Sequence, residues 1–223
     1  MLSPGRDVLG LERISELMVR LGNPHRKLPP VFHVAGTNGK GSTCAFLRAS
    51  LEAAGHSVHM YTSPHLIRFN ERIRVAGRLI DDAMLAPLLA EVLDCSTDIA
   101  PSFFEATTAA AFLAFSRTPA EAAIIEVGLG GRRIITNKIG NPLVCGIAQL
   151  GIDHQAFLGD DAVTIAGEKA GIAKAGVPLV TMNYPKGETL RIAEVASNAG
   201  ASCHPKGSDW DSAPYRGQLH YRD

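Results

Sequence analysis

Short apolar runs alternate along this chain with longer segments in which apolar residues recur every three or four positions. The runs predict buried strands, and the helical spacing predicts amphipathic helices. One run, 31–35, enters a glycine-rich turn; a helix over 40–54 leaves the turn and leads to a second strand at 57–61. This order is a βαβ unit, which implies a parallel sheet covered by helices.

The same alternation continues to residue 203, without a repeat or a linker. It predicts an α/β fold in which a parallel sheet, with a phosphate-binding loop (P-loop), has helices on both faces, in one domain over 1–223. The last stretch, "SDWDSAPYRGQLHYRD", is polar and aromatic and predicts no closing element. Further helices are predicted at 11–21, 82–93, 103–115, 160–173 and 188–199, and further strands at 122–127, 143–148, 178–182 and 201–203.

Composition and charge narrow the class of protein. The 223 residues include 22 basic and 22 acidic side chains, so the net charge of zero gives no general attraction to nucleic acid or a membrane. Cys44, Cys95, Cys145 and Cys203 are scattered without metal-binding spacing, which favours a reducing cytoplasm. The N-terminus lacks the apolar core of a signal peptide. We therefore expect a cytoplasmic protein.

The glycine-rich turn in "VFHVAGTNGKGSTCAF" (31–46) predicts a phosphate site. Backbone N–H groups in such a turn and the positive end of the following helix bind phosphate oxygens, and Lys40 would add a charge. The alternative is a tight strand-to-helix turn with a surface lysine. Ser42 comes one residue later than in the common G-x-x-x-x-G-K-[ST] pattern. The predicted ATP-binding residues are Gly36, Thr37, Asn38, Gly39, Lys40, Gly41, Ser42 and Thr43.

The variant G-T-N-G-K-G-S-T resembles the nucleotide loop of the Mur ligase superfamily, whose central domain has the fold expected here. Five further motifs resemble folylpolyglutamate synthase/dihydrofolate synthase. That family implies ATP and Mg²⁺ as cofactors, and an ATP-dependent ligase that joins glutamate to dihydropteroate or a folate through an acyl phosphate. A Mur-type ligase acting on a cell-wall precursor is an alternative, against which "SFFEATT" and "TSPHL" argue. The motifs are "LGLERI" (9–14), "YTSPHLIRFNERIRVAG" (61–77), "SFFEATTAAAF" (102–112), "IIEVGLGGR" (124–132), and "DHQAFLGD" with "EKAGI" (153–172).

A carboxylate and a lysine are the candidate chemical groups outside the loop. Glu126 ends a predicted buried strand, where an ionised carboxylate needs a cation; alternatively it emerges into solvent. The resemblance implies that Glu126 binds metal together with Ser63 and His154. Lys169, by itself typical of a solvated helix lysine, is implied to be carbamylated and to help hold a second Mg²⁺. Lys40 and Lys169 are the predicted catalytic residues.

The resemblance also implies a substrate site for the pterin. Aromatic rings at 103–104 could stack on a flat heterocycle, and a carboxylate at 105 could accept from pterin N–H groups. Two phenylalanines at the start of an apolar helix are also typical of a core. The implied residues are Leu9, Gly10, Leu11, Ser102, Phe103, Phe104 and Glu105.

Two departures from the family pattern make catalysis by this chain alone an open question. Ile134 stands, beside Arg133, where the family has an acidic residue associated with the pterin substrate. The match also covers only the N-terminal part of the family, so we expect a chain incomplete at its C-terminus that lacks the C-terminal ligase domain. The expected partners are ATP, glutamate and folate or dihydropteroate, bound by a monomer. The alternative is a non-catalytic nucleotide-binding remnant.

Overall fold

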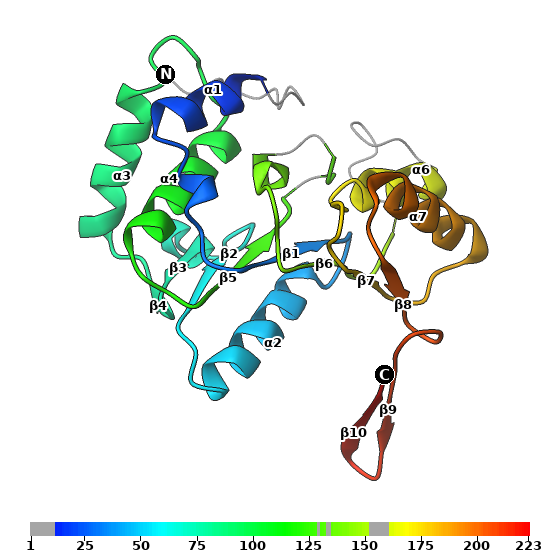
Figure 1. Ribbon diagram of the computed structural model, residues 1–223. Helices are drawn as coiled ribbons and strands as arrows, with labels where there is room; N and C mark the ends of the chain where they lie inside the picture. Colours follow the sequence, from blue (N-terminus) through cyan, green and yellow to red (C-terminus); the bar gives the residue numbers. More distant parts are fainter. Residues whose placement is uncertain (1–11, 129, 133–134, 152–160) are drawn as a thin grey trace.

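The computed structural model describes residues 12–128, 130–132, 135–151 and 161–223 (Figure 1). The predicted α/β fold is confirmed: six strands are parallel and two more extend one edge antiparallel, in the order β4-β3-β2-β5-β1-β6-β7-β8. The strands are β1 (Val31–Ala35), β2 (Val58–Tyr61), β3 (Ile73–Val75), β4 (Arg78–Leu79), β5 (Ala122–Glu126), β6 (Val144–Ile147), β7 (Leu179–Thr181) and β8 (Cys203–Pro205), with β9 (Asp211–Tyr215) and β10 (Gln218–Arg222) forming a separate hairpin. The helices are α1 (Glu12–Arg20), α2 (Lys40–Ala53), α3 (Asp82–Asp94), α4 (Phe103–Arg117), α6 (Ala162–Ala170) and α7 (Lys186–Ala199), with short 3-10 turns at Pro24–Arg26, Phe69–Arg72 and Ile135–Lys138.

Helices cover both faces of the sheet, as the apolar runs predict. Helix α2 packs on one face against β1, β2 and β5, whereas α1, α3, α4, α6 and α7 lie over the other (Figure 1). Beyond α2 the same face has an apolar groove of about 290 Å³, whose lining includes Leu47, Val144, Met182 and Trp210. The β9–β10 hairpin extends away from the body (Figure 1). Trp210, directly before β9, is one of the residues that line the groove.

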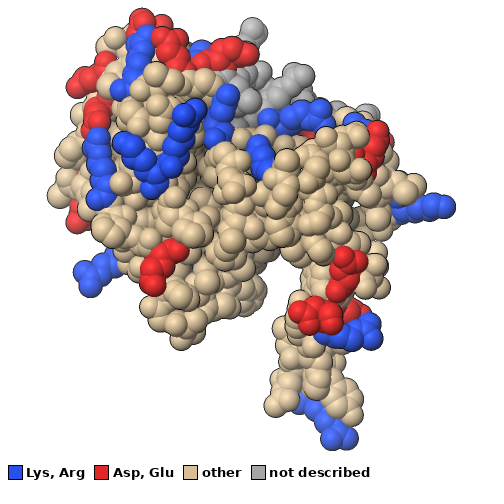
Figure 2. Space-filling view, viewed as in Figure 1, with Lys and Arg blue, Asp and Glu red and all other residues tan. Residues whose placement is uncertain are grey.

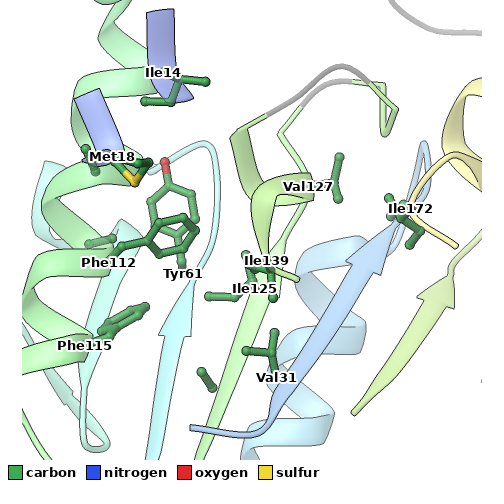
Figure 3. Close-up of a cluster of buried hydrophobic side chains, with 14 of the residues drawn as sticks. Ile14, Met18, Val31, Tyr61, Phe112, Phe115, Ile125, Val127, Ile139 and Ile172 are labelled. Carbon is green, nitrogen blue, oxygen red and sulfur yellow. The ribbon is translucent and has the colours of Figure 1, made fainter. Parts of the chain in front are cut away.

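Helix α4 lies in the main core. All but four of its residues are buried, which explains why its sequence is apolar around the whole circumference rather than along one stripe. Phe112 of this helix belongs to the same buried hydrophobic cluster as Tyr61 of β2 and Ile14 and Met18 of α1, drawn in Figure 3. This core fixes β2 and β5, whose carboxyl ends carry two of the predicted site residues.

The predicted elements are recovered with small shifts at their ends. The structure has β1 at the predicted residues and α2 one residue shorter than predicted. Strand β8 begins at Cys203, two residues later than the predicted start of that strand. Asp81 and Asp161 cap α3 and α6 by accepting from the backbone amides of Met84 and Thr164. These caps explain why α3 begins at Asp82 and α6 at Ala162.

Two hairpins were not predicted. One joins β3 to β4 through Ala76 and Gly77, and the other joins β9 to β10 through Arg216 and Gly217; all four residues have positive φ. Such two-residue turns are usually signalled by Asn-Gly or Asp-Gly. Because these turns use Ala-Gly and Arg-Gly instead, the sequence pattern does not reveal them.

No helix in the described ranges is long and apolar enough to cross a membrane. On the face shown in Figure 2, basic side chains gather over the middle of the upper body, whereas acidic side chains lie mainly along its rim. The zero net charge of the chain therefore does not mean that the two signs are evenly mixed on this face.

Candidate functional site

The glycine-rich turn lies between the carboxyl end of β1 and the first turn of α2. Gly36 has φ 147° and Gly39, which precedes the helix, has φ 74°. A Cβ on Gly36 would lie 3.0 Å from the Cβ of Ala148, so both backbone conformation and close packing require glycine there. All eight predicted ATP-binding residues lie in this turn and the first turn of α2, where Gly41 and Ser42 are exposed.

Hydrogen bonds tie the loop to the segment after β6. The backbone amides of Thr37 and Asn38 both donate to the carbonyl of Gln149, at 2.9 and 3.0 Å. The hydroxyl of Thr37 donates to the carbonyl of Gly151 at 2.9 Å. The Nζ of Lys40 donates to the carbonyl of Thr37 at 3.0 Å, so its ammonium group folds back over the loop. The turn is thus a fixed cradle with a cation at its rim.

Glu126 ends β5 beside this cradle. Glu126 is only 3% exposed, so the alternative that it emerges into solvent is wrong. It pairs in register with Val34 of β1, and a Cβ on Gly41 would lie 3.9 Å from its Oε2. Burial raises the pKa of Glu126, opposed by the backbone amide of Ser63 and by the charges of Lys40 and Arg72. A buried carboxylate beside a phosphate cradle suits a hard cation.

Ser63 follows β2 and reaches the same point. Its backbone amide donates to Glu126 Oε2 at 3.1 Å, so two of the three predicted metal ligands are adjacent. The third, His154, lies outside the described residues. Within the described ranges no cluster of three His, Cys, Asp or Glu residues is placed to hold a metal. An Mg²⁺ site needs few protein ligands, because this ion keeps waters and takes phosphate oxygens.

Lys169 lies beneath the phosphate loop. This lysine of α6 is only 3% exposed, and its Nζ donates to the carbonyl of Gly36 at 2.8 Å. The interpretation as a solvated helix lysine is therefore wrong. A Cβ on Gly131 would lie 2.6 Å from the carbonyl of Glu168 and 2.8 Å from that of Lys169. The glycine turn after β5 thus lets α6 approach closely enough for Lys169 to reach the loop.

The described part of the predicted pterin site forms the start of α4. Ser102 and Glu105 form a capping box, with Ser102 N to Glu105 Oε2 at 2.7 Å and Glu105 N to Ser102 Oγ at 3.2 Å. Arg13 also donates to Glu105 Oε2, at 3.3 Å. This carboxylate therefore already serves the helix end. Residues 9–11 lie outside the described ranges.

The two adjacent phenylalanines have different surroundings. Phe104 packs against the main core, as the alternative interpretation expects. Phe103 is 47% exposed, and the guanidinium carbon of Arg72 lies 5.5 Å from its ring centroid. Only Phe103 of this pair presents a substantial part of its ring to solvent for stacking.

Gly128, in the turn after β5, lies against the ring of Phe104. A Cβ there would lie 2.4 Å from two ring atoms of Phe104. We expect Gly128→Ala to lower the free energy of unfolding by about 1–3 kcal/mol, because the ring must be displaced from its packed position. Urea denaturation measures the loss. Gly140→Ala is the control, since a Cβ there meets nothing within 4 Å. Equal stability of the two variants would contradict the prediction.

Some residues of the site were missed by sequence reasoning. Arg72 is 9% exposed, and its Nε donates to Nδ1 of His65 at 2.8 Å. Its positive charge favours the ionised form of Glu126 and so opposes the rise in the pKa of that group. Gln149 contributes only its carbonyl, for which no side-chain signal exists. Arg72 does lie inside the motif at 61–77, but nothing in that motif indicates that the guanidinium is buried.

Comparisons with known proteins agree with the motifs. No family model matches the chain. It is 48% identical over 179 residues to the dihydrofolate synthase/folylpolyglutamate synthase of Bacillus subtilis, covering 77% of this chain and 41% of that protein. It is 40% identical over 203 residues to the protein of that name from Escherichia coli, covering 91% of this chain and 47% of the relative.

Solved structures give the same result. Escherichia coli FolC in complex with DHPP and ADP superposes with a TM-score of 0.93 at 37% identity, over 100% of this chain and 53% of FolC. An FPGS complex with AMPPCP and folate superposes with a TM-score of 0.88 at 33% identity, over 99% of this chain and 56% of that protein. The chain spans about half the length of the relatives it matches. It is a homologue of the folylpolyglutamate synthase/dihydrofolate synthase family.

Proposed function

We propose that this chain forms the ATP-binding part of a ligase that joins glutamate to dihydropteroate or to a folate. The observation that supports this most directly is the buried carboxylate of Glu126 at the glycine-rich cradle, with Lys40 at its rim. Relatives that superpose on the chain bind ADP with DHPP in one case, and Mn, AMPPNP and L-glutamate in another. The cytoplasm, where folate metabolism and reduced cysteines coincide, is the proposed location.

The reaction begins with transfer of the γ-phosphoryl group of ATP to the carboxylate of the pterin substrate. This step forms an acyl phosphate and releases ADP; the amine of glutamate then displaces phosphate and forms the amide. Loop amides and the helix N-terminus bind the phosphate oxygens, and Lys40 offsets their charge. In this reaction the chain positions ATP and stabilises the negative charge of the phosphoryl group that is transferred.

A divalent cation would be held by Glu126, with Ser63 and His154 as the other predicted ligands. When bound, Mg²⁺ supplies positive charge that stabilises the transferring phosphoryl group. Lys169 is the predicted catalytic lysine of α6, and its Nζ supports the cradle through the carbonyl of Gly36. Its carbamylation remains a prediction, which the mass of the intact native chain, measured with and without added bicarbonate, would test.

The test of the proposed function is the dependence of ATP hydrolysis on both acceptor substrates. We expect the purified chain to release phosphate from ATP only when glutamate is present together with dihydropteroate or a folate. Binding of ATP without turnover at high protein concentration would instead identify a non-catalytic remnant. Absence of ATP binding would overturn both hypotheses.

Glu126→Gln tests the proposed metal site. Removing the ionised carboxylate should weaken Mn²⁺ binding in the presence of AMPPNP by about 100-fold or more, because Mn²⁺ loses a charged ligand. Electron paramagnetic resonance of free Mn²⁺ measures the affinity. Glu121→Gln is the control, since Glu121 is a carboxylate that accepts from a backbone amide, that of Ser57 at 2.9 Å, before the start of β5. Wild-type affinity in the Glu126 variant would remove this residue from the metal site.

A further inference from the structure

One carboxylate, that of Glu71, holds the tip of the loop between β2 and β3. Glu71 accepts from three consecutive backbone amides: its Oε2 from Leu66 at 2.8 Å, and its Oε1 from Ile67 at 3.2 Å and from Arg68 at 2.9 Å. Hydrogen bonds from the amides of Arg68 and Leu66 lower the pKa of Glu71. The carboxylate is therefore ionised near neutral pH and binds all three donors as an anion.

Side-chain packing contributes little to this loop. Leu66 is 90% exposed and Ile67 is 87% exposed, so the two large apolar residues at its tip make few contacts. A segment with few buried apolar contacts opens readily unless its backbone is bound by other groups. The hydrogen bonds to Glu71 are therefore the principal restraint on the tip.

The other end of the same loop meets the candidate metal ligand. The amide of Thr62 donates to the carbonyl of Arg72 at 2.9 Å, and the next amide, that of Ser63, donates to Glu126 Oε2. The Nε of Arg72 donates to His65, two residues beyond Ser63. Glu71 immediately precedes Arg72, so the 3-10 turn that restrains the tip also restrains the part of the loop that touches Glu126.

We infer that Glu71 is a positioning residue, which fixes the loop 62–68 so that Ser63 stays against Glu126 beside the phosphate cradle. This inference rests on the proposed function for its consequence, namely the binding of a divalent cation with ATP. Groups that orient metal ligands without touching the metal change its affinity by about 10- to 100-fold when they are replaced. Glu71 is such a group, acting through the loop backbone.

The first test measures residue-resolved amide exchange by NMR in the full chain without nucleotide or metal. Glu71→Ala should speed exchange at Leu66, Ile67 and Arg68, and also at Ser63, by about tenfold, because the loss of the carboxylate releases the whole loop. Glu121→Gln, which removes the charge of a carboxylate that accepts from the amide of Ser57, is the matched control. Faster exchange confined to 66–68, with Ser63 unchanged, would overturn the inference.

The second test measures Mn²⁺ affinity in the presence of AMPPNP. Glu71→Ala is expected to weaken it by about tenfold and Glu71→Gln by less, because one amide oxygen can still accept. Unchanged affinity in both variants overturns the inference. If the wild-type chain itself binds neither AMPPNP nor Mn²⁺, the proposed function fails, whereas the exchange at Ser63 still decides the role of Glu71.

Discussion

Replacing Lys40 by methionine is expected to weaken AMPPNP binding by about 100-fold and to reduce ligation by at least as much. Methionine keeps most of the apolar stem but removes the ammonium group, which folds over the loop at 3.0 Å from the carbonyl of Thr37. Removal of one donor from a preorganised anion site typically costs 10²- to 10³-fold in rate. Isothermal titration with AMPPNP measures the binding loss independently of turnover.

Arg48→Met provides the control for Lys40. Arg48 lies on the same helix, α2, and pairs with Glu52 at 2.9 Å instead of facing the loop. Its replacement removes an equal charge from the same helix. The ion pair that it breaks is half-buried, with side chains 24% and 31% exposed, and does not include any of the predicted phosphate-binding residues. AMPPNP affinity should stay within about twofold of wild type. If the Lys40 and Arg48 variants bound AMPPNP equally well, the loop would not be the nucleotide site.

The sequence was sufficient to predict the elements that build the phosphate loop. Strand β1 and helix α2 are signalled by local features, namely an apolar run, three closely spaced glycines and the small-residue helix that follows. Glu126 could be placed at the end of β5 for the same reason. Because the carboxyl ends of neighbouring parallel strands lie at one edge of the sheet, β1 and β5 bring the loop and the carboxylate together.

The features that were missed depend on contacts between distant segments. The burial of Lys169 requires Gly131 to let α6 approach the turn after β5, a contact that helix periodicity cannot reveal. The capping box between Ser102 and Glu105 was visible as an S-x-x-E pattern but was interpreted as substrate binding. The carbonyl of Gln149 and the guanidinium of Arg72 became part of the site only through tertiary structure.

Of the residues predicted for the metal and pterin sites, some lie in the described part of the structure and others do not. Ser63 and Glu126 were predicted from the family resemblance, and the structure brings them to 3.1 Å. His154 and Ile134 lie outside the described residues, so the third ligand and the consequence of the missing acid stay predictions. Measuring ligation separately with dihydropteroate and with a folate would show whether Ile134 restricts the substrate.

His33 is a further polar residue that the apolar pattern of β1 concealed. Its side chain is fully buried, with Nε2 at 3.1 Å from the hydroxyl of Thr136, and its Nδ1 has no hydrogen-bond partner among the described residues. Burial, together with the charge of Lys174, lowers the pKa of His33 to about 3. Protonation of this ring inside the core is therefore strongly unfavourable.

This shift makes the stability of the chain depend on pH. In the unfolded chain a histidine has a pKa of about 6.5, so between about 6.5 and 3 the unfolded state binds a proton that the folded state does not. The contribution of His33 to the free energy of unfolding is therefore fully present above about pH 6.5. It is lost as the pH decreases, by up to about 1.4 kcal/mol per pH unit. Below about pH 3 the folded state also binds the proton, and this loss ends.

Replacing His33 by glutamine is expected to remove this part of the pH dependence. Glutamine does not titrate and can keep the hydrogen bond to Thr136. Between pH 7 and pH 4.5 the wild type should lose about 3 kcal/mol more than the variant, measured by urea denaturation at both pH values. His220→Gln, at an exposed position on β10, is the control and should show the same loss of stability as the wild type. Since carboxylates titrate equally in all three proteins, an identical pH dependence of wild type and the His33 variant would mean that the buried ring takes up its proton without cost.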